Sequence, residues 1–411
     1  MPYKHTRTQR IVRLVTLRGL SPATLLQCPA LRAEAGRLWT TLVSWHTQAR
    51  AQGRWLSAGD LEPATKGGQY ALHSQSVQAL CQKFAANVAM ATALADIGHV
   101  QTQYPHHPKA YQTVIWKDQA LLILPNGQLR LPTGGQRPPL LLPLPSEYHT
   151  SNLRRAELTW RADHYELCLT IDMGETLPPP LLAGAVAGVD LGEVHIAAVT
   201  TSTRHALLIS GRQLRSCKQW RNKVHSVLQE QLRRCQPGSR RTKRLLKRKA
   251  QVSAKVYRQQ RDLLHQAART VVDFCQTEGV SQIAVGDVRD IQTGVSLGHV
   301  TNQKISQWPH GQVARYLREK AARLGMVVEW IDEAYSTRTC SHSGHVQLSS
   351  PRGRRFRCLG CGARVHRDGN GSANICSKAA HGVYSKVQAD TVKYLRPLGV
   401  APRTRASSSW R

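Results

Sequence analysis

The spacing of hydrophobic and polar positions changes along the first half of the chain. Residues 9–20 alternate polar and apolar side chains, a pattern typical of a half-buried strand. Residues 28–104 carry apolar side chains three or four positions apart, which predicts helices. From 105 to 180, short β-forming runs alternate with turns rich in proline and glycine. This half therefore predicts a β module with a helical insertion, followed by a proline-rich linker at 177–180.

The second half of the chain predicts strands and helices of an α/β domain. A hairpin comes first, two long helices follow, and single strands then alternate with shorter helices. In chain order these predicted elements lie at 185–190, 196–200, 212–235, 240–277, 282–285, 311–324, 326–331 and 366–375. Beyond about residue 386 we expect a flexible tail.

The overall charge points to a polyanionic partner. Lysine and arginine together number 57 and aspartate and glutamate 25, a net charge of +32 over 411 residues. Nucleic acid is the first candidate and an anionic membrane surface the second. A hydrophobic content of 41% argues against a wholly disordered basic chain. No run of about 18 apolar residues occurs, so we expect no membrane-spanning segment.

The positive charge is concentrated in the two long predicted helices. Between Arg212 and Arg261 we count 17 lysines and arginines against one acid, Glu230. A solvated helix face mixes both signs, so this excess predicts a surface held against phosphates. The candidate nucleic-acid contacts are Arg212, Arg215, Lys218, Arg221, Lys223, Arg240, Arg241, Lys243, Arg244, Lys247, Arg248, Lys255, Arg258, Lys304 and Trp308. Trp308 can stack on a base, although most aromatic residues beside strand ends belong to the core.

Several of the few acids stand at the ends of predicted elements. Asp190 ends a strand, Asp332 and Glu333 follow another strand, and Asp368 stands at a helix start. Each position alone is ordinary, because aspartates end strands and cap helices. Together, such carboxylates can hold two Mg²⁺ ions about 4 Å apart. Those ions would activate a water and stabilise the leaving oxygen of a phosphodiester.

The cysteines predict one local metal site. Ten cysteines in 411 residues are too sparse for a disulfide scaffold, so we expect a reducing, cytoplasmic compartment. Cys340, Cys358 and Cys361 fall within 22 residues. The C-x-x-C spacing of the last two can place both sulfurs on one tetrahedral ion. The alternative is a loop with three unmetallated thiols.

The order of the motifs resembles that of the TnpB family. The matching motifs are G-V-D-L-G at 188–192, I-A-V-G-D at 283–287, K-I-S-Q-W-P-H-G at 304–311, D-E-A-Y-S-T-R-T-C at 332–340 and R-D-G-N-G-S-A-N at 367–374. TnpB proteins are transposon-encoded, RNA-guided nucleases related to compact type V CRISPR effectors. The likeness covers residues 184 to about 378, and residues 1–180 match only in layout.

The resemblance implies a multidomain α/β protein. It implies an RNase H-like RuvC domain with a zinc-ribbon insertion, and an N-terminal β-barrel wedge domain that carries a helical recognition insertion. The expected boundaries are 1–27 and 105–180 for the wedge, 28–104 for the recognition domain, 181–337 and 363–385 for RuvC with its basic helical pair at 212–277, 338–362 for the ribbon, and 386–411 for the tail.

The chain departs from the family pattern at the middle catalytic carboxylate. The resemblance makes Asp190 the first and Asp368 the last carboxylate, but Gly286 stands where most relatives have a glutamate. Glu333 in turn stands where they usually have proline. We predict that the glutamate has moved to the neighbouring strand, as in a subset of relatives with rearranged sites. The alternatives are a crippled site, or Asp287 in the middle role.

The ribbon also departs from the family pattern. Relatives have a second C-x-x-C, whereas this chain has Ser343 at the fourth ligand position. We expect one structural zinc held by Cys340, Cys358 and Cys361, with His345 as the fourth ligand and His342 as the alternative.

The resemblance implies a Mg²⁺-dependent, RNA-guided DNA endonuclease. Asp190, Glu333 and Asp368 would hold two catalytic Mg²⁺ ions. The partners would be a guide RNA and target DNA, cut next to a short duplex motif. We favour a monomer and expect no membrane partner. The alternatives are an RNA-guided binding protein that does not cut, and a DNA-binding transposition accessory without RNA.

Overall fold

A computed structural model describes residues 8–98, 102–135, 137–288, 298–349, 351 and 353–397 of the chain. The contacts divide it into two units, Met1–Thr176 and Leu177–Arg411. The division falls beside the proline run that follows Leu177. No helix in the described ranges is long and apolar enough to cross a membrane.

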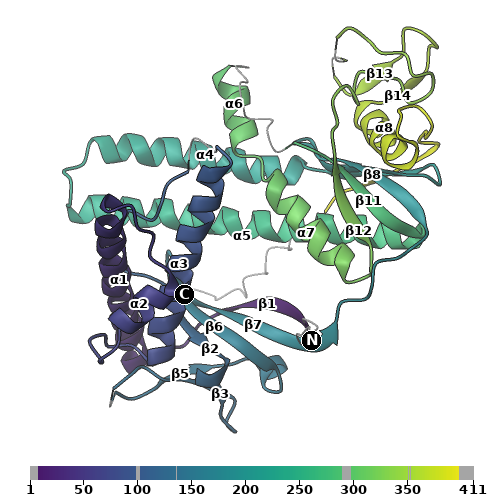
Figure 1. The fold of residues 1–411 in the computed structure, drawn as a ribbon. Coiled ribbons are helices and arrows are strands. Elements are labelled where there is room, and N and C mark those ends of the chain that lie inside the picture. Colours follow the sequence, from purple (N-terminus) through teal and green to yellow (C-terminus); the bar gives the residue numbers. More distant parts are fainter. Residues whose placement is uncertain are drawn as a thin grey trace, which may run out of the picture. The chain divides into compact units, whose positions relative to one another are not determined.

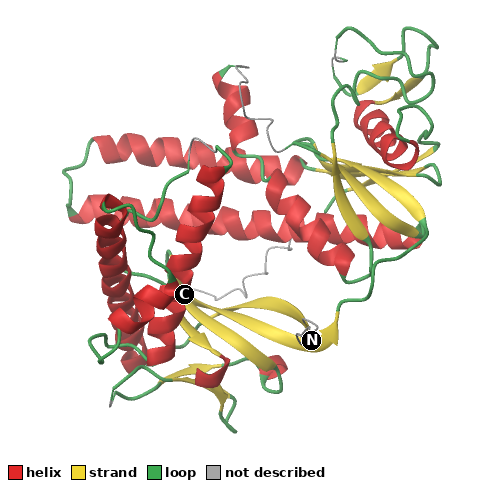
Figure 2. Ribbon diagram, viewed as in Figure 1, coloured by secondary structure: helices red, strands yellow, loops and turns green. Residues whose placement is uncertain are grey.

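The first unit consists of helices and two antiparallel sheets (Figures 1 and 2). Its elements are β1 (Thr8–Thr16), α1 (Pro22–Ala51), α2 (Ala58–Ala64), α3 (Ser74–Asp96), β2 (Val114–Lys117), η1 (Asp118–Ala120), β3 (Leu122–Ile123), β4 (Gln128–Leu131), β5 (Leu140–Pro143), η2 (Ser146–Tyr148), β6 (Asn152–Arg161) and β7 (His164–Thr176). The sheets have the strand orders β1-β7-β6-β2 and β3-β4-β5. Closure of these strands into a barrel stays a prediction.

Helix α1 begins earlier than the hydrophobic pattern predicts. The expected helical region starts at residue 28, but the helix starts at Pro22. Ser21 caps it, because its hydroxyl accepts a hydrogen bond from the Thr24 N–H at 3.2 Å. Proline in the first turn loses no helical hydrogen bond, which makes the start compatible with Pro22.

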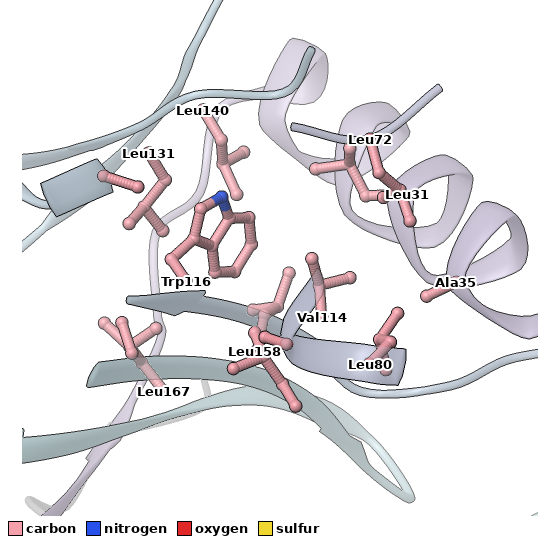
Figure 3. Packing of buried hydrophobic residues seen from close by; sticks show 14 of the residues in the cluster. Leu31, Ala35, Leu72, Leu80, Val114, Trp116, Leu131, Leu140, Leu158 and Leu167 are labelled. Atoms are coloured by element: carbon pink, nitrogen blue, oxygen red, sulfur yellow. The ribbon is translucent and has the colours of Figure 1, made fainter. Parts of the chain in front are cut away.

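The core of the first unit joins its helices to its sheets. Trp116 is fully buried, and its indole N–H donates to the Pro132 carbonyl at 2.8 Å. Leu131 and Leu140 from the smaller sheet and Leu158 from the larger one lie around it (Figure 3). A buried indole usually keeps a hydrogen-bond partner for its N–H, and Trp116 does so.

The second unit is built on one mixed sheet. Its elements are β8 (Ala185–Asp190), β9 (His195–Thr201), β10 (His205–Ser210), α4 (Arg212–Arg233), α5 (Arg240–Thr277), β11 (Val280–Gly286), α6 (His299–Ser306), α7 (His310–Ala322), β12 (Val327–Ile331), β13 (Arg355–Arg357), β14 (Arg364–His366), α8 (Arg367–His381) and β15 (Thr391–Leu395). The sheet order is β12-β11-β8-β9-β10-β15, and β13 and β14 form a separate pair. Strands β8, β11 and β12 run parallel to one another.

The two faces of this sheet carry different helices. Ala187 and Val189 of β8 belong to a core shared with α5 and α7. Between them, Gly188 faces α8, where a Cβ atom would overlap with the backbone of Ser372 and Cys376. Successive side chains of a strand point to opposite faces, so Asp190 shares the α8 face with Gly188. Figure 1 shows α8 on the side of the sheet opposite α7.

Four strands of this unit, β10, β13, β14 and β15, were missed by the sequence prediction. β10 was not predicted, and the expected flexible tail is wrong for β15, which pairs in parallel with β10. Arg204 forms an ion pair with Asp390, just before β15, in which Nε lies 2.8 Å from Oδ2. A short strand whose partner lies far away in sequence has no local signature strong enough to reveal it.

Candidate functional site

Asp190 lies at the end of β8, on the α8 face of the sheet. A Cβ atom at Gly371 of α8 would lie 2.8 Å from Asp190 Oδ2, so a larger residue at position 371 would force this carboxylate to shift. Burial, followed by the negative charges of Glu333 and Asp368, raises the pKa of Asp190 well above its usual value. The carboxylate therefore lies in a negative environment that favours either a proton or a cation.

Glu333 occupies the space that a side chain at Gly286 would need. Gly286 ends β11 and pairs with Ile331 of β12, two residues before Glu333. A Cβ atom on Gly286 would overlap with Glu333 Oε2 and lie 3.2 Å from Glu333 Cδ. The Glu333 carboxylate thus follows the neighbouring strand β12 and lies beside the backbone of Gly286.

The Glu333 carboxylate is buried and incompletely hydrogen-bonded. Its Oε2 atom has no hydrogen-bond partner in the described part of the chain. Burial, with further repulsion from Asp287 and Asp332, raises the pKa of Glu333 to about 7. An unsatisfied buried oxygen is costly, so it marks a position where a cation would be stabilising.

Asp368 lies in the first turn of α8 and is contacted by one histidine and two arginines. His195 Nδ1 lies 2.7 Å from Oδ2, and Arg354 and Arg367 lie 2.9 Å and 3.2 Å from the carboxylate oxygens. Burial alone would raise the pKa of Asp368, but the hydrogen bond from His195 and the charges of Arg354 and Arg367 lower it to about 2. This carboxylate is therefore ionised.

The three carboxylates share one face of the sheet, but their oxygens are not all in contact. Among the residues that the structure describes, the acid-containing group whose ligand atoms all lie within 4.8 Å is His195, His366 and Asp368. Asp190 lies close enough to both Asp368 and Glu333 for their negative charges to raise its pKa. The sequence analysis missed both histidines, although His195 begins the strand next to Asp190 and His366 precedes Asp368 by two residues.

The other two acidic candidates take different positions. Asp332 is exposed, and its Oδ2 pairs with Lys378 Nζ at 3.2 Å. Asp287 follows β11, and its backbone N–H donates to the Ile331 carbonyl at 2.9 Å. Alternation along β11 places Gly286 on the α8 face and Asp287 one position beyond it. Of these acids, the carboxylate that reaches the space above Gly286 is that of Glu333.

The donor set suits a hard divalent cation. Carboxylate oxygens are the preferred ligands of Mg²⁺, and Glu333 Oε2 is buried without a partner. Asp190, Glu333 and Asp368 are therefore the residues that would hold Mg²⁺.

The predicted cysteine cluster forms in the segment that carries β13 and β14, and these two strands lie beside α8 (Figure 1). The sulfurs of Cys340, Cys358 and Cys361 all lie within 4.8 Å of one another. Cys340 and Cys358 are buried beside Phe356, in a small core of their own. The structure does not bring the ring nitrogens of His342 or His345 into this group. The expected three thiolates are thus together, and the expected imidazole is not.

Most of the predicted cationic contacts lie on the surface of α4 and α5. The two helices pack side by side, and Lys249 Nζ donates to Gln229 Oε1 at 2.9 Å between them. The exposed candidates are Arg212, Lys223, Arg240, Arg241, Lys243, Arg244, Lys247, Arg248 and Lys255, and the half-buried ones are Arg215, Arg221, Arg258 and Lys304. Arg215 also pairs with Glu193 at 3.5 Å.

Two of these candidates are buried, which corrects the sequence prediction. Lys218 is 6% exposed, and burial lowers its pKa to about 8. Trp308 is 8% exposed and belongs to the core around α5 and α7. Neither side chain is available on the surface for a phosphate or a base. Trp308 takes the core alternative that the sequence analysis left open. Lys218 is buried because a helix that packs on another helix buries part of its polar face.

The chain matches two family models, which lie between residues 168 and 375. Residues 168–292 match a family described as a probable transposase, OrfB_IS605, and residues 310–375 match the TNB domain of Cas12f1-like proteins. The first match includes Asp190 and the basic helices. The second includes Glu333, the three cysteines and Asp368.

The chain also resembles individual proteins. It is 26% identical over 112 residues to the CRISPR-associated endodeoxyribonuclease Cas12f1 of Sulfoacidibacillus thermotolerans, a match that covers 27% of this chain and only 25% of that protein. The fold is similar to that in a cryo-EM structure of a Cas12f1–sgRNA–target DNA complex, with a TM-score of 0.62, 13% identity, and coverage of 87% and 83% of the two chains. The family matches and this shared fold therefore support a similarity to TnpB-like compact type V effectors.

Proposed function

We propose that this chain is an RNA-guided, Mg²⁺-dependent DNA endonuclease. The similar Cas12f1 protein is named an endodeoxyribonuclease, and the similar fold was solved with sgRNA and target DNA. On this proposal, the guide RNA supplies the target sequence by base pairing. The exposed cations of α4 and α5 bind the nucleic-acid backbone, which makes binding strongly dependent on salt.

The observation that carries the proposal is the position of the Glu333 carboxylate. It fills the space above Gly286 that a glutamate side chain at that position would enter. The carboxylate that is missing at Gly286 of β11 is therefore replaced by that of Glu333, just after β12. The buried, unpartnered Oε2 supports a ligand at this point.

The residues of the chain divide the work in this proposal. Two Mg²⁺ ions, when bound, would supply an activated water and neutralise charge on the leaving oxygen. Asp190 and Glu333 present oxygens from the ends of β8 and β12, the two strands that flank β11, and Asp368 presents its carboxylate from the start of α8. Both Asp368 oxygens accept hydrogen bonds from Arg354, so Arg354 must give way at least in part when a cation binds.

The test begins with the RNA that copurifies with the protein. Its sequence defines a target, and cleavage of that target is then measured with Mg²⁺ for the wild type, Glu333→Ala and Asp287→Ala. We expect Glu333→Ala to abolish cleavage and Asp287→Ala to retain most of it. The double variant Gly286→Glu/Glu333→Ala should regain part of the activity, because it returns the carboxylate to β11. Loss with Asp287→Ala and full activity with Glu333→Ala would refute the assignment.

A second function, guided binding without cleavage, is favoured by one observation. The Asp368 carboxylate is fully occupied by His195, Arg354 and Arg367. If this arrangement persists on target DNA, the wild type will bind its target tightly at millimolar Mg²⁺ and leave both strands intact. A preparation without copurifying RNA would instead favour a DNA-binding transposition accessory.

A further inference from the structure

The two cysteine-containing turns of the ribbon, 340–345 and 358–363, repeat the same backbone pattern. Each begins at a cysteine, Cys340 or Cys358, and spans six residues. In each turn, the N–H of the first residue donates to the carbonyl of the sixth, and the N–H of the fifth donates to the carbonyl of the first. These bonds are Cys340 to His345 at 3.0 Å, Gly344 to Cys340 at 2.9 Å, Cys358 to Ala363 at 2.9 Å and Gly362 to Cys358 at 3.1 Å.

The hydrogen bonds to sulfur follow the same repeat. The third residue of each turn, His342 or Gly360, directs its backbone N–H at the sulfur of the first cysteine. Such N–H groups stabilise a thiolate, as a metal ligand requires. The repeat therefore makes the fourth residue of one turn equivalent to the fourth residue of the other.

This equivalence pairs Ser343 with Cys361. The Ser343 hydroxyl lies 3.5 Å from Cys358 Sγ, beside the cluster of three sulfurs. His345 is instead equivalent to Ala363, the residue whose carbonyl closes the turn. The His345 ring packs against the second turn, where a Cβ atom on Gly360 would lie 3.2 Å from its Nδ1. Ser343 thus occupies the position at which a fourth metal ligand would lie.

We infer that the ribbon binds Zn²⁺ through three thiolates and leaves the fourth position, at Ser343, to water. A neutral hydroxyl is not among the ordinary zinc ligands, which are thiolate, imidazole and carboxylate. Ser343 and Cys361 are both exposed, so solvent reaches this corner of the site. Three protein ligands with an open fourth position bind zinc less tightly than four thiolates and exchange it more readily. This inference goes beyond the proposed nuclease activity and does not depend on it.

Cobalt substitution tests the inference on the full-length protein with its copurifying RNA. The metal is removed with a chelator, and Co²⁺ is added while visible and near-ultraviolet absorption is recorded. The charge-transfer intensity reports the number of thiolates, and the visible bands report tetrahedral geometry. We expect three thiolates in the wild type and a spectral change when imidazole is added, because imidazole can replace a bound water.

The variants identify the fourth corner. Ser343→Cys should raise the charge-transfer intensity by about one third, abolish the response to imidazole and tighten Zn²⁺ binding by about tenfold or more, since even outer changes alter metal affinity by 10–100-fold. Ser349→Cys, an exposed serine of the same ribbon, is the matched control and should change none of these. His345→Ala and His342→Ala should leave the spectrum unchanged.

Three results would overturn the inference. A changed cobalt spectrum in His345→Ala or His342→Ala would make that imidazole the fourth ligand. A wild-type spectrum insensitive to imidazole would show that the fourth position is not open. Failure of the wild type to bind Co²⁺ or Zn²⁺ while Ser343→Cys binds both would show that three thiolates are insufficient. None of these readouts involves DNA cleavage, so they are independent of the nuclease proposal.

Discussion

Replacing Gly286 by alanine tests whether the space above β11 belongs to Glu333. The added Cβ atom would overlap with Glu333 Oε2 and lie 3.0 Å from Ile375 Cδ1. The carboxylate can move aside because it ends a flexible side chain. The loss of folding stability in Gly286→Ala should therefore not exceed the roughly 1–3 kcal/mol that overpacking a core costs. A carboxylate displaced by about 1 Å can nevertheless lower the rate of a catalysed reaction about 100-fold.

The assay separates these two effects. Single-turnover cleavage of the guided target is measured at several Mg²⁺ concentrations, together with target binding and thermal unfolding. We expect Gly286→Ala to bind the target normally, to unfold near the wild-type temperature and to cut about 100-fold more slowly. Gly311→Ala is the matched control, because nothing lies within 4 Å of the Cβ position at Gly311. Wild-type cleavage by Gly286→Ala would refute the reasoning.

Further predictions concern charge and burial. The pKa of Glu333 is raised to about 7, so the folded protein without metal binds an extra proton at this residue, and its stability should fall as pH rises from about 4.5 to about 7. In the wild type, this fall in the free energy of unfolding should reach up to about 3 kcal/mol, and Glu333→Gln should remove most of it. Chemical unfolding across this pH range measures the fall in both proteins. Arg354→Ala removes a cation from Asp368 and should lower the Mg²⁺ concentration needed for half-maximal cleavage, whereas Arg355→Ala, at an exposed neighbour, should not. The double variant Lys247→Ala/Arg248→Ala should bind RNA of any sequence more weakly than the wild type, and its affinity should depend less on salt. Filter binding at low and high salt measures both effects. Trp308→Ala should destabilise the fold by about 3–5 kcal/mol, and near-normal stability with lost RNA binding would contradict its place in the core.

The long helices and the main strands of the second unit could be predicted because their signals are local. The periodicity of residues 240–277 coincides with α5, and the apolar run at 185–190 coincides with β8. Asp368 at the start of α8 follows from the same local logic. The pairing of β15 with β10 could not be predicted, because it depends on a strand nearly two hundred residues away in sequence.

The candidate site was predictable as a set of residue types, but not as an arrangement. The C-x-x-C spacing predicted the cluster of Cys340, Cys358 and Cys361, because a short turn fixes the distance between two sulfurs. It did not predict that His345 would lie outside that cluster. Likewise, no pattern revealed that Arg354 would contact Asp368, since the fold of the ribbon alone brings this arginine to the helix start.

Sequence by itself determined the charge, the helical and extended segments and the chemical kinds of ligand, because composition and periodicity are properties of neighbouring residues. Tertiary structure alone decided that the ring nitrogens of His345 lie outside the cysteine cluster, that Arg354 contacts Asp368, and that Lys218 and Trp308 are buried. Packing brings distant segments together, and the resulting contacts set which side chain reaches a shared site and which is withdrawn from solvent.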